Sequence, residues 1–136
     1  MEQQGKINIS EQLEYLRTMI SSLDNQISIL ARGMEEIQRA SSILKEDGLE
    51  ESDDIKTLIG AGIYARSSLK LSEKLFVPIG SDLYIEEGRE KTLLRLQKNF
   101  EEVSGSLKTA QERRDDLAMR YDSLVTLIQQ SPQQSK

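Results

Sequence analysis

Two long segments of this 136-residue chain carry a heptad repeat, which restricts the fold more than any other feature. In each segment apolar residues recur in alternating steps of three and four, and ten of eleven positions are apolar. A period of 3.5 residues keeps one apolar stripe facing one partner helix, so the repeat indicates a left-handed coiled coil. These positions, called the seam below, are Ile9, Leu13, Leu16, Ile20, Leu23, Ile27, Leu30, Met34, Ile37, Ser41 and Leu44, then Leu93, Leu96, Phe100, Val103, Leu107, Ala110, Arg114, Leu117, Tyr121, Leu124 and Ile128.

Local signals predict where each helix begins and ends. Asn8, followed three residues later by Glu11, fits a capping box, and Gly48 in the stretch EDG supplies a stop. The polar stretch SPQQSK at the end of the chain predicts a disordered tail. We therefore expect a tail over residues 1–8, a helix over 9–46, an insert over 47–88, a helix over 89–130 and a tail over 131–136.

The insert also predicts the direction of the helix pair. If the helices were parallel, the whole spacer between them would have to extend back along the length of the coiled coil. The spacer contains turn signals, which argue against such an extended path, so we expect antiparallel helices. Arg114 and Ser41 are the two polar seam positions. We interpret Arg114 as laying its methylene groups along the seam and reaching solvent or a carboxylate of the partner helix, which would help to select the register.

The insert contains a duplicated element with a period of two. The stretches LIGAGIYA and VPIGSDLYI repeat after twenty residues, so that Gly60 corresponds to Gly80 and Tyr64 to Tyr84. A two-residue connection after each glycine predicts two β-hairpins, joined by residues 70–73. We expect these hairpins to be the oligomerisation surface, formed by Leu58, Ile59, Gly60, Ile63, Tyr64, Phe76, Val77, Pro78, Ile79, Gly80, Leu83, Tyr84 and Ile85.

An isolated hairpin is marginal in water because two strands bury little surface and leave open edges. We therefore predict that the hairpins join those of neighbouring subunits in an intersubunit β-barrel, within a mainly α chain. Pro78 has no N–H to donate and suits an edge or the start of a strand. The alternative is that the hairpins only cap one coiled coil, which would leave much β-branched and aromatic surface unused.

Composition excludes several classes of function. The chain has no Cys and no His, which removes thiol chemistry, disulfides, zinc sites and imidazole catalysis. Its net charge of −5 argues against nucleic-acid binding, and no apolar run suggests a signal peptide or a membrane partner. We expect a cytoplasmic protein that is not an enzyme and needs no cofactor or metal.

The chain resembles the prefoldin family, in its archaeal alpha type. The resemblance lies in TLIGAGIYA and LFVPIGSDLYI, flanked by heptad helices that cover nearly the whole chain, and the two hairpins favour the alpha over the beta type. The first hairpin departs from the pattern, with Leu58 where the second has Pro78. The resemblance implies an ATP-independent holdase: a hexamer of two alpha and four beta-type subunits that binds non-native client proteins at its coiled-coil tips and delivers them to a group II chaperonin.

In that architecture the chain termini lie at the tips, and apolar residues off the seam are frequent towards both termini, including Ile29 and Met119. Near the insert, from residue 35 to 45, we expect polar off-seam positions. Seam residues at a free end would also stay partly accessible. The expected client-binding residues are Ile7, Ile9, Leu13, Tyr15, Leu16, Met19, Leu124, Val125, Leu127 and Ile128.

Two alternatives stay open at this stage. The off-seam apolar residues can be ordinary helix-surface residues or part of a wider core stripe. The chain can also be a structural coiled-coil protein that builds filaments or scaffolds through the same hairpins. An enzyme using Asp, Glu, Lys, Ser and Tyr has no supporting constellation in the sequence.

Overall fold

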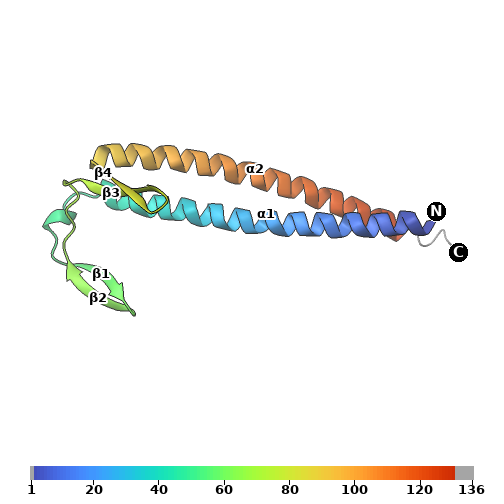
Figure 1. Ribbon diagram of the computed structural model, residues 1–136, viewed down its shortest axis with the longest axis horizontal. Helices are drawn as coiled ribbons and strands as arrows, with labels where there is room; N and C mark the ends of the chain where they lie inside the picture. The colour runs from blue at the N-terminus through green and yellow to red at the C-terminus, as the bar shows by residue number, and fades with distance from the viewer. Residues whose placement is uncertain (1, 131–136) are drawn as a thin grey trace. The chain divides into compact units, whose positions relative to one another are not determined.

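The computed structural model describes residues 2–130 of the chain, with side chains from residue 8 onward. Along the chain, two β-hairpins lie between two long helices, which confirms the predicted fold class (Figure 1). The predicted tail over residues 131–136 lies outside the described residues. The elements are α1 (Glu2–Lys45), a 3-10 turn η1 (Leu49–Glu51), β1 (Ile55–Gly60), β2 (Ile63–Ser67), β3 (Leu75–Gly80), β4 (Leu83–Glu87) and α2 (Arg89–Gln130).

The helix α1 begins earlier than the sequence predicted. The helix begins at Glu2 and includes most of the residues expected to form a tail, so that Asn8 is an exposed residue inside the helix. A capping box needs a chain that enters from outside the helix, and no proline stands before Asn8 to force such an entry. At the other end α1 stops at Lys45, and Gly48 adopts a φ of 88°.

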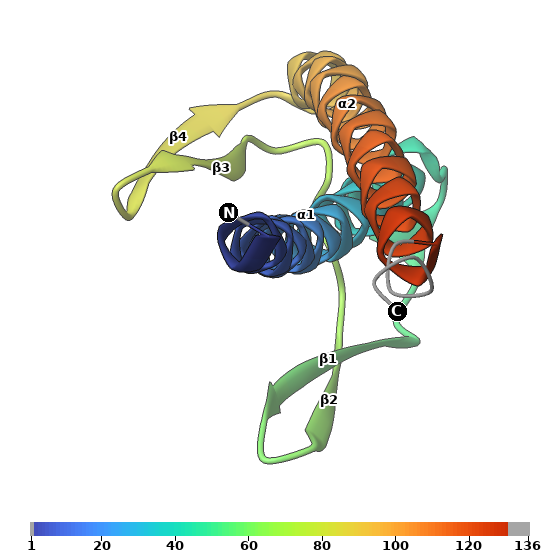
Figure 2. The ribbon, with the colours of Figure 1, turned by 90° about the vertical axis from the view of Figure 1, so that its right-hand side faces the viewer.

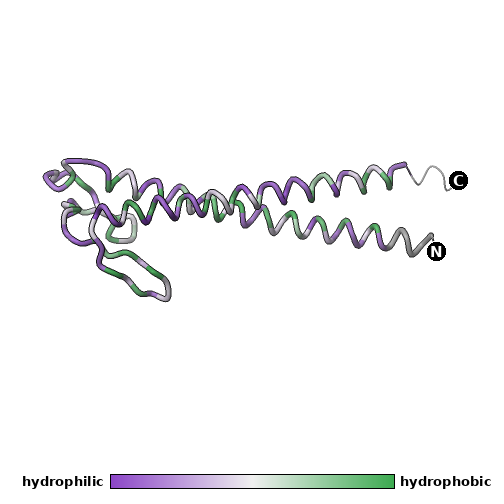
Figure 3. The backbone as a smooth tube through the Cα atoms, turned by 90° about the horizontal axis from the view of Figure 1, so that it is seen from above, coloured by the Kyte–Doolittle hydropathy of each residue, from purple (hydrophilic) through white to green (hydrophobic). Residues whose placement is uncertain are grey.

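The chain divides into two compact units, which are described separately. The terminal unit contains the first part of α1, up to Met34, and the part of α2 from Val103 onward. Its core consists of Leu16, Leu23, Ala110 and Leu117, with further seam residues packed against it. Figure 3 shows the alternation of hydrophilic and hydrophobic residues along both helices that produces this stripe.

Two interhelical hydrogen bonds establish the antiparallel direction in the terminal unit. Arg17 Nη2 donates to the Tyr121 hydroxyl at 2.8 Å, and Arg114 Nε donates to Asp24 Oδ1 at 2.9 Å. The later residue of α1 thus pairs with the earlier residue of α2. The contact of Arg114 with Asp24 confirms that the polar seam position reaches a carboxylate of the partner helix.

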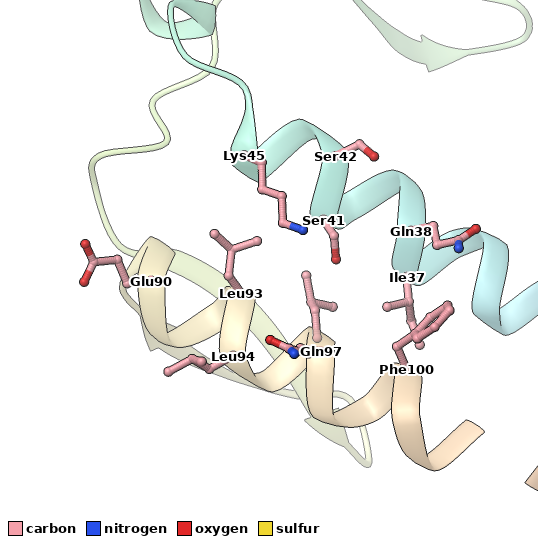
Figure 4. A pocket seen from close by; sticks show the side chains of 11 residues that line it. Ile37, Gln38, Ser41, Ser42, Lys45, Glu90, Leu93, Leu94, Gln97 and Phe100 are labelled. Carbon is pink, nitrogen blue, oxygen red and sulfur yellow. The ribbon is translucent and has the colours of Figure 1, made fainter. Parts of the chain in front are cut away.

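All twenty-two predicted seam positions are buried or half-buried, Ser41 and Arg114 included. The central unit, residues 35–102, continues the pairing, since Ile37, Ser41 and Lys45 of α1 and Leu93 and Phe100 of α2 line one cavity between the helices (Figure 4). The sequence therefore identified the helix faces that pack together.

Each hairpin forms its own two-stranded antiparallel sheet (Figure 2). In β1–β2, Lys56 lies opposite Arg66 and Leu58 opposite Tyr64; in β3–β4, Phe76 lies opposite Glu86 and Pro78 opposite Tyr84. One extra residue, Ile59 or Ile79, precedes each turn as a bulge. The register of the second hairpin thus repeats that of the first.

Both turns have positive φ at each central residue, as two-residue hairpin loops require. The values are 50° and 77° at Ala61 and Gly62, and 52° and 60° at Ser81 and Asp82. Gly60 and Gly80 also have positive φ, which explains why the duplicated motif keeps glycine there.

Candidate binding and assembly surfaces

The hairpins expose a large apolar surface that nothing within the described chain covers. Eight large apolar side chains of the strands are 53–70% exposed, and Figure 3 shows the long hydrophobic stretches that contain them. Val77 and Ile85 are half-buried. The eight are Leu58, Ile59, Ile63, Tyr64, Phe76, Ile79, Leu83 and Tyr84, all of which belong to the predicted oligomerisation surface. Apolar surface of this density is typical of an interface.

An ion pair between a buried carboxylate and a half-exposed guanidinium fixes the base of the second hairpin to α2. Glu87, the last residue of β4, is 4% exposed and receives hydrogen bonds from Arg95 Nε at 3.1 Å and Arg95 Nη2 at 2.7 Å. The Thr92 hydroxyl donates to the same carboxylate at 3.1 Å. These bonds, with that from Arg95 the strongest influence, hold the pKa of Glu87 below its ordinary value of 4.5, although burial opposes them.

Arg89, at the start of α2, closes the C-terminal end of α1. Its guanidinium donates to the carbonyls of Leu44 and Glu46 and lies 3.8 Å from the Asp47 carboxylate. The last carbonyls of a helix have no partners within it and carry negative partial charge, so a cation there stabilises the end. The two helices are therefore joined at this point by a side chain as well as by the seam.

The connector between the hairpins is anchored rather than free. Leu71 is only 6% exposed, and the Ser72 N–H donates to the Glu50 carboxylate of η1. Sequence reasoning treated this stretch as a simple joint and missed both contacts, as it missed Glu87 and Arg89. Only the single apolar Leu71 between polar neighbours could have suggested an anchor.

The predicted client-binding residues differ in their exposure. Tyr15 and Leu127 are 64% and 56% exposed, and Met119, an off-seam residue outside that predicted set, is 69% exposed. Tyr15 and Met119 also line a groove of about 600 Å³. Leu16 is buried in the core, and the side chain of Ile7 lies outside the described residues. The others are half-buried: Ile9, Leu13, Met19, Leu124, Val125 and Ile128.

Exposed apolar residues are not confined to the terminal unit. The expectation of polar off-seam positions between residues 35 and 45 was wrong, because the sequence itself has Ile43 there and its side chain is exposed. Leu94 of α2 is exposed as well. Leu94 lines an open cavity of about 800 Å³ between the helices, together with Ile37, Leu93 and Phe100 (Figure 4). Exposure by itself therefore does not single out the terminal unit.

Comparison with known proteins places this architecture in a family. The model of the prefoldin family, described as "Prefoldin subunit", matches residues 9–134. The chain belongs to the prefoldin family.

Curated relatives are alpha-type prefoldin subunits. The chain is 33% identical to prefoldin subunit alpha of Thermoplasma acidophilum over 86% of this chain and 90% of that protein. It is 39% identical to that of Thermoplasma volcanium over 68% and 71% of the two chains. These relatives confirm the resemblance to the archaeal alpha type and support a chaperone subunit rather than an enzyme.

A solved structure shares the fold. The cryo-EM structure of a filamentous PFD from Methanocaldococcus jannaschii superposes with a TM-score of 0.67 and 14% identity, covering 86% of this chain and 98% of that one. Membership of the prefoldin family implies assembly into a prefoldin complex. Within residues 2–130, neither helix has a stretch long and apolar enough to cross a membrane.

Proposed function

We propose that this chain is a subunit of an ATP-independent holdase that binds non-native proteins through its terminal unit and delivers them to a group II chaperonin in the cytoplasm. The observation that carries the proposal is membership of the prefoldin family, and the chain offers two exposed apolar surfaces for its roles, one on the hairpins and one on the terminal unit. The first surface serves assembly and the second serves clients.

The hairpins assemble into an intersubunit β-barrel in this proposal, within a hexamer of two alpha and four beta-type subunits. The support is the open edges of two separate two-stranded sheets, combined with their exposed apolar side chains. Strand pairing between subunits would satisfy the unpaired backbone groups and cover the apolar faces in one step.

Client binding would be weak at each tip and strong in the complex. At roughly 25 cal/mol per Å² of apolar surface removed from water, a few hundred Å² gives modest affinity. Several tethered tips then raise the overall affinity through effective concentration. Met119 and Tyr15 suit this role, because a flexible thioether and an amphipathic ring accommodate irregular partners.

A triple substitution tests the client surface. Tyr15→Ser, Met119→Ser and Leu127→Ser remove exposed apolar groups with little cost to the seam, whereas Val125 and Ile128 are half-buried and would confound stability with binding. We expect this variant, mixed with a beta-type subunit, to lose most of the suppression of light scattering by a diluted denatured enzyme.

The matched control carries Ile43→Ser and Leu94→Ser, which remove exposed apolar groups from the central unit. It should assemble and suppress aggregation as the wild type does. Unchanged suppression by the triple variant, with assembly intact, would refute the terminal unit as the client surface.

A second candidate function is a filament-forming scaffold that assembles through the same hairpins. The solved relative with this fold is described as filamentous, which favours the idea at the level of the fold. Mass measurement separates the two. A closed complex with a beta-type subunit supports the chaperone, and open polymers of this chain without another subunit support the scaffold.

A further inference from the structure

A groove in the terminal unit carries an exposed thioether at its edge. The groove, of about 600 Å³, is lined by Tyr15 and Leu16 from α1 and by Met119 and Leu124 from α2. Leu16 is buried and Leu124 is half-buried, whereas Tyr15 and Met119 are exposed. The two leucines therefore lie deeper in the groove, and the side chains of Tyr15 and Met119 meet water at its edges.

Of the methionines with described side chains, Met119 is the easiest for a dissolved oxidant to reach. The chain has no cysteine, so its methionines carry all of its sulfur. Met119 is 69% exposed, whereas Met19 and Met34 are half-buried. Met34 occupies a seam position, and Met19 packs against the core of the terminal unit. Because an oxidant must meet the sulfur from solution, Met119 should react before the other two.

Oxidation of a thioether by a peroxide is an oxygen transfer. The sulfur attacks one peroxide oxygen, the O–O bond breaks and an S–O bond forms, so the sulfur gives up two electrons. With hydrogen peroxide, the released hydroxide takes the proton from the new S–O group and leaves as water. The product is a polar sulfoxide, which a thiol-dependent sulfoxide reductase returns to the thioether as two thiols become a disulfide and water leaves. The change is therefore reversible.

The fold tolerates a sulfoxide at Met119. This residue lies off the seam, so the core of the terminal unit keeps its packing. Gln12 and Arg120 line the same groove, and both side chains carry N–H groups that can donate to a sulfoxide oxygen. A sulfoxide at Met19 or Met34 would instead place a polar group in the apolar seam, where burial without a partner costs stability. Oxidation at Met119 thus changes the surface of the groove and leaves the helix pair stable.

The oxidised groove would bind apolar groups less well. A client side chain that packs on Met119 would have to remove water from the sulfoxide oxygen, and a polar group that loses water without a new hydrogen bond costs free energy. We propose that Met119 is an oxidation site at which a peroxide reversibly weakens the binding of non-native proteins. The inference rests on the proposed function of the terminal unit as the client surface.

Mass spectrometry identifies the oxidation site without an activity assay. The isolated full-length chain is treated with limiting hydrogen peroxide and then cut with trypsin. Cleavage after lysine and arginine places the three methionines in separate peptides, residues 18–32, 33–39 and 115–120. We expect the peptide that contains Met119 to gain oxygen several-fold faster than the other two. Equal rates for the three peptides would overturn the proposal.

A second test measures client binding. The chain is oxidised, freed of peroxide and mixed with an untreated beta-type subunit, and each protein is compared with its own untreated sample in the light-scattering assay. We expect the oxidised wild type to need about fourfold more protein for half suppression, the factor that corresponds to one buried CH₂. Met119→Leu, which keeps the volume and removes the sulfur, should lose this response to peroxide. Met34→Leu is the matched control and should respond as the wild type does.

Thermal unfolding separates a change of surface from a loss of fold. The melting temperature of the oxidised wild type should fall by no more than about 3 °C, as for a surface substitution. A larger fall, or a Met119→Leu chain that still responds to peroxide, would overturn the proposal. Full suppression by the oxidised wild type would overturn it too and would leave the proposed function standing. No suppression by the untreated wild type would refute the proposed function, and this inference with it.

Discussion

Substituting Leu117 by alanine tests the heptad seam as the source of stability. Leu117 is 9% exposed in the core of the terminal unit, beside Leu16, Leu23 and Ala110. The change removes three carbons, worth about 2.4 kcal/mol at roughly 0.8 kcal/mol per buried CH₂. A remaining cavity adds to this, because two paired helices collapse only partly around one missing side chain, so we expect a loss of about 3 kcal/mol.

The assay is thermal unfolding followed by circular dichroism, at one fixed protein concentration because assembly also contributes to stability. For a chain of this size, 3 kcal/mol corresponds to a fall in melting temperature of about 10 °C. The control is Leu127→Ala, the same chemical change at a side chain that is 56% exposed. It should cost about 0.5 kcal/mol or less. Equal shifts for the two variants would show that the seam is not the stabilising core.

Three further predictions concern an ion pair, a turn residue and a titrating carboxylate. Arg114→Leu should keep or raise the melting temperature, because the pair with Asp24 is 39% and 51% exposed and is worth about 0.5 kcal/mol, less than a buried leucine at this seam position; a clear fall would contradict this. Ala61→Asn should stabilise the first hairpin by about 0.5 kcal/mol, since asparagine tolerates the φ of 50° better than alanine does, as measured by hydrogen exchange of its strands. The hydrogen bonds from Arg95 lower the pKa of Glu87, so they stabilise the fold fully above the ordinary pKa of 4.5, and this stabilisation is lost as the pH falls through the lowered pKa. Protection from hydrogen exchange at the base of the second hairpin should therefore decrease in acid. The Glu87→Gln variant should not show this pH dependence.

The sequence predicted the helix faces correctly because a coiled coil encodes them in a local period. Every seam position from Ile9 to Leu44 and from Leu93 to Ile128 is buried or half-buried, including the polar Arg114. The hairpins were equally accessible to prediction, since Gly60 and Gly80 mark turns whose geometry depends on a few adjacent residues.

The start of α1 and the exposure of individual apolar side chains were harder to predict from the sequence. A capping residue such as Asn8 is only a preference, and it has no effect where the helix continues through it. Val125 is half-buried whereas Leu127 is exposed, a difference that depends on the exact rotation of α2 against its partner and that a repeat of threes and fours does not specify.

The sequence by itself determined two things about this protein: a pair of helices with matching apolar stripes, and two copies of a turn that brings strands together. Both depend on neighbours within a few residues along the chain. Tertiary structure decided how these parts are joined, through the pair of Glu87 with Arg95, the closure of α1 by Arg89 and the anchor at Leu71. These contacts form where the backbone changes direction, so neither periodicity nor local propensity predicts them. Their atoms come within bonding distance of one another only in the folded chain.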